Sequence, residues 1–428
     1  MNRYLIIPDC SDYNRGDQAL IWETIRIAKD AGFQGEYYMQ SDGVDCTQSA
    51  KEGIKVFHPI LPHPSRGGAE NNVNYKGVLL KWGARALKDL FCSLWVLLIC
   101  KKRSLCHAFL GKEKNDSLDL FRDSSAVFVK GGGFIHSFGG PTAFYFIYYH
   151  LYTINLAHAM GLPVYIMPNS FGPIDGFLCK WQVRKALSRC RLVYCREHIS
   201  HEYMTKTFPS LSFRNSFDLG LYLNRDDAGV SYDMPDKKIR VAITVRPYRF
   251  PEHNNGDDLY RSYIASMRGF ARWLIEKGYH PVFVQHTLSQ NAHEDDMQAI
   301  RDILTDLPDY QYGLFADSSY NCRQMKSLYS HFDYIVGTRF HSVVFSMMEG
   351  VPAIAIAYGG NKTRGIMQDM GLGEYVIGID EVTVDSIVSL FSGLVANRET
   401  VKIRLQELKG AVDEERRKIV DCLKEKGK

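Results

Sequence analysis

Arg339 and His341 lie in a stretch, residues 333–362, whose spacing suits the binding of a small anion. A short apolar run breaks at Gly337 and is followed by Arg339, Phe340 and His341, after which an apolar helical pattern begins. In open α/β sheets, such a strand-to-helix turn lies at the carboxyl end of the strand, where ligands bind. Backbone N–H groups at the helix start also favour an anion there.

Lys362 closes the same stretch. It follows a second apolar run, residues 353–357, which predicts a buried strand. The two strands end at one edge, so Lys362, Arg339 and His341 predict a site for a small, doubly charged anion. The alternative is that Arg339 and His341 are only surface or capping groups at a helix start.

Polar residues at the ends of other predicted strands favour the anion site over that alternative. Together they predict a cleft between two doubly wound sheets. In chain order these residues are Asp17, His136, Asn169, Arg196 and Arg246.

Two of these polar positions have structural alternatives. Asp17 opens the first helix, after Asn14, and an N-cap would explain it equally well. His136 follows a glycine triplet that includes Gly132 and Gly133, and we expect it on a loop where backbone approaches a ligand. A plain tight turn is the alternative. Residues 168–173, which include Asn169, are expected to form a loop at the rim of the sheet.

The order of strands and helices predicts an α/β fold with two doubly wound domains. At 428 residues the chain is long enough for two cores. The polar segment 224–238 is the best candidate linker. We therefore expect an N-terminal α/β domain, a linker, a C-terminal α/β domain and a charged C-terminal helix, at residues 1–223, 224–238, 239–395 and 396–428.

Composition narrows the classes of function. A net charge of +4 gives no nucleic-acid footprint. The ten cysteines form no CxxC pair and no zinc-like spacing, so no metal is expected. The N-terminus lacks the apolar length of a signal peptide, which predicts cytoplasmic residence with reduced thiols. The GxGxxG fingerprint of dinucleotide binding is absent.

One apolar segment, from Leu90 to Cys100, has a single polar member, Ser93, and basic residues on both sides. It is too short to cross a bilayer, which takes about 20 apolar residues. A buried core helix and an interfacial helix held to an anionic membrane surface both remain open.

The sequence resembles the polysaccharide pyruvyltransferases over about residues 1–375. Each motif alone is weak, but their order along the chain is fairly specific. The motifs are Asn14-Arg15-Gly16-Asp17, Gly131-Gly132-Gly133, Ser170-Phe171-Gly172-Pro173, Arg196-Glu197, Val245-Arg246, Arg339-Phe340-His341, Gly350-Val351-Pro352 and residues 358–362.

The resemblance implies a GT-B-like fold of two Rossmann-like domains, with residues 1–223 on the acceptor side and residues 239–395 on the phosphoenolpyruvate side. It also implies transfer of a pyruvyl group from phosphoenolpyruvate to two hydroxyls of a sugar, with no further cofactor. Arg246, Arg339 and His341 would hold the donor, with Lys362 and Arg196 as weaker candidates. Two departures are Phe340, where leucine is usual, and a spacing one residue longer than usual before Lys362.

The residue types fit this chemistry. Phosphoenolpyruvate carries a carboxylate and a phosphate, which suit forked guanidinium groups. Imidazole, with a pKa near 6.5, suits proton delivery to the methylene carbon. We therefore expect Arg246 and Arg339 to clamp the donor, His341 to be the general acid and Asp17 the general base. The further candidates for substrate contact are Phe340, Lys362, Arg196, Asn14, Gly132, Gly133, His136 and Asn169.

Two other functions remain open at this point. A nucleotide-sugar glycosyltransferase would need a carboxylate for the ribose, for which Glu349 lies at the wrong end of its helix. A non-catalytic glycan- or anion-binding subunit would not need a proton donor. The acceptor implied by the resemblance is a sugar of a surface polysaccharide or of its lipid-linked precursor. The segment from Leu90 to Cys100 would then place the enzyme at the inner membrane face.

Overall fold

A computed structural model describes residues 1–42, 45–63, 75–232, 238–251, 253–289, 294–308, 311–359 and 362–427. Its contacts divide the chain into two compact units. The first unit comprises Met1–Ser11, Thr24–Ser216 and Ile419–Lys428, and the second comprises Asp12–Glu23 and Phe217–Lys418. Each unit contains its own parallel sheet, and the fold is GT-B-like with two Rossmann-like domains.

The first unit contains an eight-stranded sheet with the order β3-β2-β1-β4-β6-β7-β8, and β5 pairs with β6 off this path. Its central strands are apolar runs because helices cover both faces of a parallel sheet. The strands are β1 (Arg3–Ile7), β2 (Glu36–Gln40), β3 (Lys55–Phe57), β4 (Ala126–Val129), β5 (Gly132–Phe138), β6 (Val164–Asp175), β7 (Leu192–Cys195) and β8 (Arg214–Asn215).

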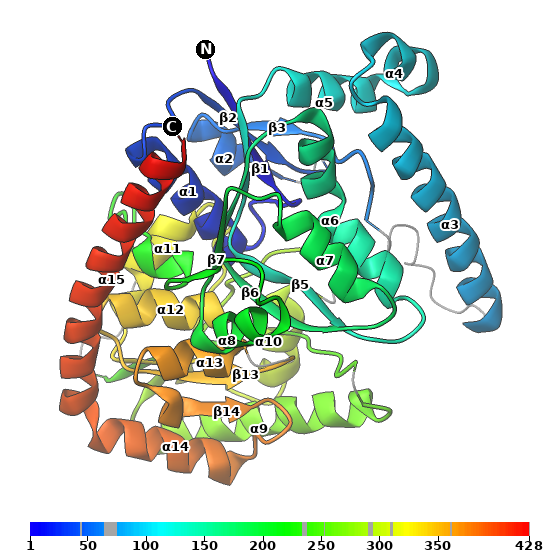
Figure 1. The fold of residues 1–428 in the computed structure, drawn as a ribbon. Helices are drawn as coiled ribbons and strands as arrows, with labels where there is room; N and C mark the ends of the chain where they lie inside the picture. The colour runs from blue at the N-terminus through cyan, green and yellow to red at the C-terminus, as the bar shows by residue number, and fades with distance from the viewer. Residues whose placement is uncertain are drawn as a thin grey trace. The chain divides into compact units, whose positions relative to one another are not determined.

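The helices of the first unit include α3, which lies along its outer edge with α4 at one end (Figure 1). These helices are α2 (Thr47–Lys51), α3 (Tyr75–Ile99), α4 (Arg103–Phe109), α5 (Lys112–Arg122), α6 (Ala143–Met160), α7 (Cys179–Leu187) and α8 (His198–Thr207). Helix α1 (Arg15–Asp30) contributes residues to both units.

The second unit contains a six-stranded parallel sheet with the order β11-β10-β9-β12-β13-β14. The chain passes from β9 to β10 and β11 on one side, then returns to β12 on the other side of β9. This reversal is the topological switch point at which doubly wound folds bind ligands. The strands are β9 (Arg240–Thr244), β10 (His280–Val284), β11 (Gly313–Phe315), β12 (Tyr334–Gly337), β13 (Ala353–Ala357) and β14 (Val376–Gly378).

Helices of the second unit follow its strands in turn. They are η1 (Leu219–Tyr222), α9 (Gly256–Glu276), α10 (Asp296–Leu304), α11 (Cys322–Tyr329), α12 (Phe340–Met348), α13 (Lys362–Asp369), η3 (Gly373–Tyr375), α14 (Val384–Ala396) and α15 (Arg398–Gly427), whose last residues group with the first unit. The expected linker, 224–238, lies partly outside the described residues, because 233–237 are among those left out.

Two expected loops of the first unit are strands. His136 and Ser137 lie in β5, and residues 168–173 continue the long strand β6. The two segments pair in parallel, with Gly132 opposite Asn169 and Ile135 opposite Phe171. Each segment satisfies the backbone groups of the other, and this long-range pairing outweighs the local turn signals of glycine and proline.

The apolar segment of helix α3 is partly buried, as expected for a core helix, and partly exposed, as expected for an interfacial helix. Ser93, Val96 and Cys100 are buried, whereas Phe91 and Leu98 on other faces are exposed. The Ser93 hydroxyl lies 2.7 Å from the Tyr148 hydroxyl of α6 and joins the two helices. Among the described residues, no helix has both the length and the hydropathy to cross a membrane.

Candidate functional site

Arg246 and Arg339 lie at the switch point of the second sheet. Each follows its strand by two residues, Arg246 after β9 and Arg339 after β12. The two strands are neighbours, with Thr244 opposite Gly337. Two guanidinium groups that are 93 positions apart in the sequence therefore emerge from adjacent strand ends.

Arg339 is held in one orientation by buried acceptors. Its Nε donates to Asp296 Oδ1 at 2.6 Å and its Nη2 donates to the Glu294 carbonyl at 2.6 Å. Asp296 also accepts from the backbone N–H groups of His286 and Thr287, at 3.0 and 2.8 Å. Burial raises the pKa of Asp296 to about 6, and the positive charge of Arg339 opposes that rise.

Arg246 lies against aromatic rings. Its guanidinium carbon is 4.3 Å from the centre of the Tyr358 ring and 5.4 Å from that of Tyr248. Burial acts to raise the pKa of the Tyr358 hydroxyl, but the charges of Arg246, Arg339 and Lys362 outweigh it and the pKa is lowered. Three cations thus act on one phenol, which marks this strand edge as a region of strong positive potential.

A carboxylate already lies between the two arginines. Arg246 Nη2 is 3.4 Å from each carboxylate oxygen of Glu294. Arg339 Nη1 is 3.8 Å from Glu294 Oε2. The Glu294 side chain is 54% exposed, so this contact is at the surface of the site. The two guanidinium groups can therefore share one small anion.

His341 lies in the first turn of α12, between a buried carboxylate and helix α1. Its Nε2 is 3.5 Å from Asp218 Oδ1, and Asp218 is fully buried. Asp218 Oδ1 also accepts from the Gly220 N–H at 2.8 Å, which fixes the carboxylate. On the other side, a Cβ added at Gly16 would lie 2.1 Å from His341 Nδ1, so only glycine leaves room for the ring.

His286, at the end of β10, connects these two parts of the site. Burial lowers the pKa of His286, and the electrostatic interactions with His341 and Arg339 act in the same direction. The Nδ1 of His286 lies 3.0 Å from the Tyr329 hydroxyl. Arg339, which follows β12, and His341, in the first turn of α12, therefore both lie near the buried imidazole of His286.

Asn14 and Asp17 form the start of α1 in the second unit. Asn14 Oδ1 accepts from the Gly16 N–H at 3.0 Å, and Asn14 Nδ2 donates to Asp17 Oδ2 at 3.0 Å. Asn14 therefore satisfies the helix start, and Asp17 occupies the first turn, where a negative charge is favourable. Asn14 also bridges to Thr287 beside the Asp296 anchor.

The remaining expected residues have these positions: Phe340 is buried at the start of α12, and Lys362 begins α13. In the first unit, Asn169 donates from Nδ2 to the Lys130 and Met167 carbonyls, both at 2.8 Å. Arg196 is 1% exposed and donates from Nε to Ser170 Oγ at 2.7 Å. These contacts anchor Asn169 and Arg196 within the first unit, and their expected contact with substrate stays a prediction.

His136 is half-buried in β5, and Gly132 and Gly133 begin the same strand of the first unit. His136 Nδ1 lies 3.0 Å from the Gly133 carbonyl, and its ring contacts those of Phe138 and Phe146. The structure therefore groups seven of the expected residues in the second unit and five in the first. The first group is Asn14, Asp17, Arg246, Arg339, Phe340, His341 and Lys362, and the second is Gly132, Gly133, His136, Asn169 and Arg196.

Sequence reasoning missed several polar residues that shape these sites, among them Asp296, which anchors Arg339. Asp218 and Glu294 contact His341 and the two arginines, but nothing in their local sequence indicates this. Tyr358 lay within a recognised motif and could have been identified from its place after a buried strand. Asp9 follows β1 in the first unit, and burial, with a contribution from the charge of Asp42, raises its pKa to about 7.

Glu349, the one carboxylate considered for a nucleotide ribose, has other partners. Its Oε2 lies 3.1 Å from Arg225 Nη1 and its Oε1 lies 3.5 Å from Lys326 Nζ. Both contacts occur at the carboxyl end of α12. Glu349 therefore serves as a charge partner in that region.

Comparison with known structures identifies the fold. A UDP-glucosyltransferase from Polygonum tinctorium superposes with a TM-score of 0.56 at 10% identity, covering 100% of this chain and 98% of that one. The S. aureus protein MnaA, in its structure with UDP, gives a TM-score of 0.53 at 10% identity, covering 95% and 91%. At such low identity these likenesses concern the fold alone.

Sequence comparison is more specific. Amylovoran biosynthesis protein AmsJ of Erwinia amylovora is 27% identical over 312 residues, covering 70% of this chain and 71% of that protein. The family model for polysaccharide pyruvyl transferase matches residues 14–360, which include both arginines, His341 and the start of α1. On this match the chain belongs to the polysaccharide pyruvyltransferase family and is a transferase enzyme.

Proposed function

We propose that this enzyme transfers the pyruvyl group of phosphoenolpyruvate to two hydroxyls of a sugar in a surface polysaccharide or its lipid-linked precursor. The products are a cyclic pyruvate ketal and inorganic phosphate. The observation that carries the donor assignment is the Glu294 carboxylate held between Arg246 and Arg339. A donor with a carboxylate and a phosphate suits two guanidinium groups with Lys362 beside them.

The reaction divides into additions that these residues can support. A sugar hydroxyl adds to C2 of phosphoenolpyruvate while His341 protonates the methylene carbon. Phosphate then leaves, and the second hydroxyl adds to the resulting cation and closes the ketal. Asp218 Oδ1 lies 3.5 Å from His341 Nε2 and would hold the imidazole ring in position for this step. Asp17 stays the candidate base that accepts a hydroxyl proton.

The donor assignment is tested by ligand-induced stabilisation. Phosphoenolpyruvate is expected to raise the melting temperature, whereas uridine and guanosine diphosphates leave it unchanged. The opposite ranking would favour a nucleotide-sugar glycosyltransferase, a function that the fold of the structural neighbours permits.

The proton-transfer role is tested by turnover. His341→Ala is expected to lower ketal formation by about 10²–10⁴-fold, the range typical of a general acid. The matched control is His331→Ala, which removes an exposed histidine of the same unit. Activity of His341→Ala within about threefold of the parent protein would remove His341 from the mechanism. Absence of turnover by the parent with every acceptor sugar of a broad panel would favour a non-catalytic binding subunit.

A lipid-linked acceptor would bring the enzyme to the cytoplasmic face of a membrane, and we propose that α3 makes this contact. Trp95 and Leu98 are 48% and 77% exposed, and Lys101 and Lys102 follow the helix. Apolar burial and anionic lipid would act together there. The double variant Trp95→Asp, Leu98→Asp should lose cosedimentation with phosphatidylglycerol vesicles. Ile403→Asp, an exposed apolar site in α15, is the control, and equal binding by both variants would exclude α3.

A further inference from the structure

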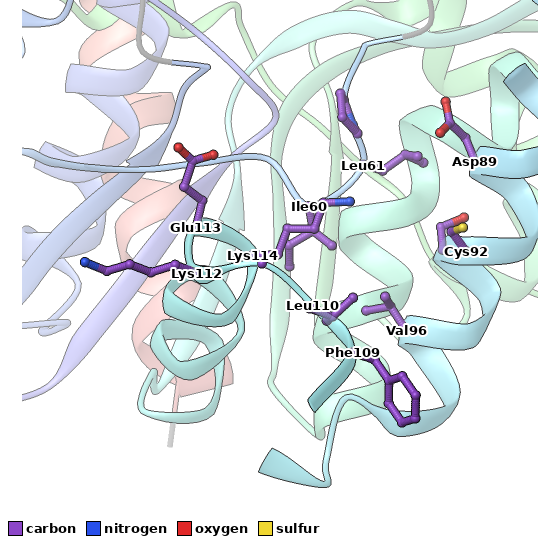
Figure 2. A pocket seen from close by; sticks show the side chains of 13 residues that line it. Ile60, Leu61, Asp89, Cys92, Val96, Phe109, Leu110, Lys112, Glu113 and Lys114 are labelled. Atoms are coloured by element: carbon purple, nitrogen blue, oxygen red, sulfur yellow. The ribbon is translucent and has the colours of Figure 1, made fainter. Parts of the chain in front are cut away.

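The first unit contains a cavity of about 590 Å³ beside the inner side of α3. Residues 60–62, α3 and the connection from α4 to α5 surround it (Figure 2). Ile60, Leu61, Val96 and Leu110 form its centre, whereas Lys112 and Glu113 point away from it (Figure 2). The size is that of a ligand pocket. Most of its lining is apolar, and the charged residues of the lining are Asp89, Lys112, Glu113 and Lys114.

The hydroxyl in the cavity wall already has partners. Ser93 Oγ donates to the Leu90 carbonyl at 3.0 Å and lies 2.7 Å from the Tyr148 hydroxyl. The Ser93 hydroxyl therefore needs no hydrogen-bond partner from a ligand. Cavities lined by apolar groups stay dry and accept apolar molecules. The lining accordingly favours a hydrocarbon over a sugar or a nucleotide.

The cavity continues into an exposed apolar surface. Phe109 lines the cavity, is 66% exposed, and its ring lies 6.3 Å from that of Trp95. Trp95 belongs to one face of α3, at helical spacings of three and four residues. The members of this face and their exposed fractions are Leu87 58%, Phe91 69%, Leu94 41%, Trp95 48% and Leu98 77%.

Charge defines the head group that such a chain would carry. Residues 83–114 contain seven Lys or Arg (85, 88, 101, 102, 103, 112 and 114) and two acidic residues, Asp89 and Glu113. One of the seven, Arg103, is paired with Asp119 at 2.9 Å. Lys101 and Lys102 are exposed at the end of α3, and Lys114 is half-buried on the cavity wall. This balance complements an anionic head group at the apolar surface.

We propose that the cavity binds the hydrocarbon chain of an amphiphile with an anionic head group. The chain enters past Phe109, and its head group stays near the lysines. Two sources have this chemistry: a membrane phospholipid and a prenyl phosphate carrier of the sugar acceptor. Only the second source rests on the proposed function, because binding itself needs no pyruvyl transfer.

The rate at which the Cys92 thiol is labelled can report whether the cavity is occupied. Cys92 lines the cavity, and it is the exposed member of the ten cysteines, the others being buried or half-buried. The full chain is treated with a maleimide, and labelling of the Cys92 peptide is followed by mass spectrometry. At farnesyl phosphate concentrations about ten times Kd, labelling should slow about tenfold, because about one molecule in eleven keeps an open cavity.

Three further ligands separate the sources and control for the head group. Dioctanoyl phosphatidylglycerol below its critical micelle concentration tests the phospholipid source. Isopentenyl phosphate tests a short chain on the same head group as farnesyl phosphate, and inorganic phosphate tests the anion alone. Protection by farnesyl phosphate or the phosphatidylglycerol supports the proposal and assigns the source. Protection by neither, or equal protection by the two short controls, overturns it.

Two variants separate the cavity from the outer surface. Leu110→Trp fills the cavity and should abolish protection while leaving vesicle binding intact. Leu98→Asp alters the exposed face and should leave protection by farnesyl phosphate intact. Loss of protection in Leu98→Asp but not in a folded Leu110→Trp would overturn the cavity as the site. If Leu110→Trp fails to fold, labelling of the parent chain still decides.

Discussion

At the scale of single residues, the donor site depends on how firmly two guanidinium groups are fixed. Arg339 is bound to the buried Asp296, whereas Arg246 rests on the rings of Tyr248 and Tyr358. A buried ion pair adds little to stability but holds a planar group in one orientation. Arg339 therefore provides a guanidinium group in a fixed orientation. Arg246, at the end of the neighbouring strand, provides the second guanidinium group of the anion site.

We expect the Glu294 carboxylate to compete with the donor for the guanidinium groups of Arg246 and Arg339. Glu294→Gln removes the negative charge and is expected to lower the Kd for phosphoenolpyruvate by about 1.4- to fivefold, since an exposed ion pair contributes roughly 0.2–1 kcal/mol. The shift is measured by calorimetric titration at low salt. Glu276→Gln, at an exposed position in α9, is the control. Weaker binding in Glu294→Gln would mean that this carboxylate positions the arginines instead of competing.

At the scale of secondary-structure elements, a tight turn positions the residues proposed to bind the donor and to transfer the proton. A Cβ at Gly337 would lie 2.7 Å from Val343 Cγ2, so the chain can turn from β12 into α12 only with glycine there. The Thr244 hydroxyl, on β9, lies 2.7 Å from Ser342 Oγ in the first turn of α12. These contacts fix the helix start that carries Arg339 and His341.

Gly16→Ala tests whether the start of α1 positions His341. The added Cβ would lie 2.1 Å from Nδ1, so the ring must move. A displacement of about 1 Å can reduce turnover by about 100-fold, so a large fall in kcat is expected with the fold retained.

Gly393→Ala is the matched control, because a Cβ there meets nothing within 4 Å. It should keep full activity and gain stability of roughly 0.5–1 kcal/mol as a helical glycine replaced by alanine. Equal activity of both variants would show that His341 does not depend on α1.

At the scale of the whole molecule, each unit has its own sheet and its own charged groups at the carboxyl strand edge. In the first unit the pKa of Asp9 is raised from 3.8 to about 7 by burial, with the negative charge of Asp42 adding to the rise. The folded state therefore holds a proton that the unfolded chain releases near pH 4. Stability falls as pH rises from about 4 to about 7, because the folded protein then binds more protons than the unfolded chain.

Asp9→Asn should remove this dependence. At pH 8 its melting temperature is expected to exceed that of the parent, by about 2–4 °C for each kcal/mol gained. The difference should shrink as pH falls from 7 to 4. Scanning calorimetry measures it, with Asp116→Asn, at an exposed position of α5, as the control. A constant offset at all pH values would contradict the raised pKa of Asp9.

The sequence by itself determined the alternation of strands and helices and the place of Arg246 and Arg339 after buried strands. Apolar runs and turn residues are local signals, and parallel strands bring their carboxyl ends to one edge by rule. It also indicated the family, through motifs that the family model matches over residues 14–360.

Only the tertiary structure decided that Asp218 faces His341, that Glu294 lies between the arginines, and that residues 132–138 are a strand. The two faces of α3, one packed and one exposed, were likewise beyond the sequence. Each depends on partners far apart along the chain, whose packing and hydrogen bonds outweigh local preference. A local sequence pattern carries no information about such long-range contacts.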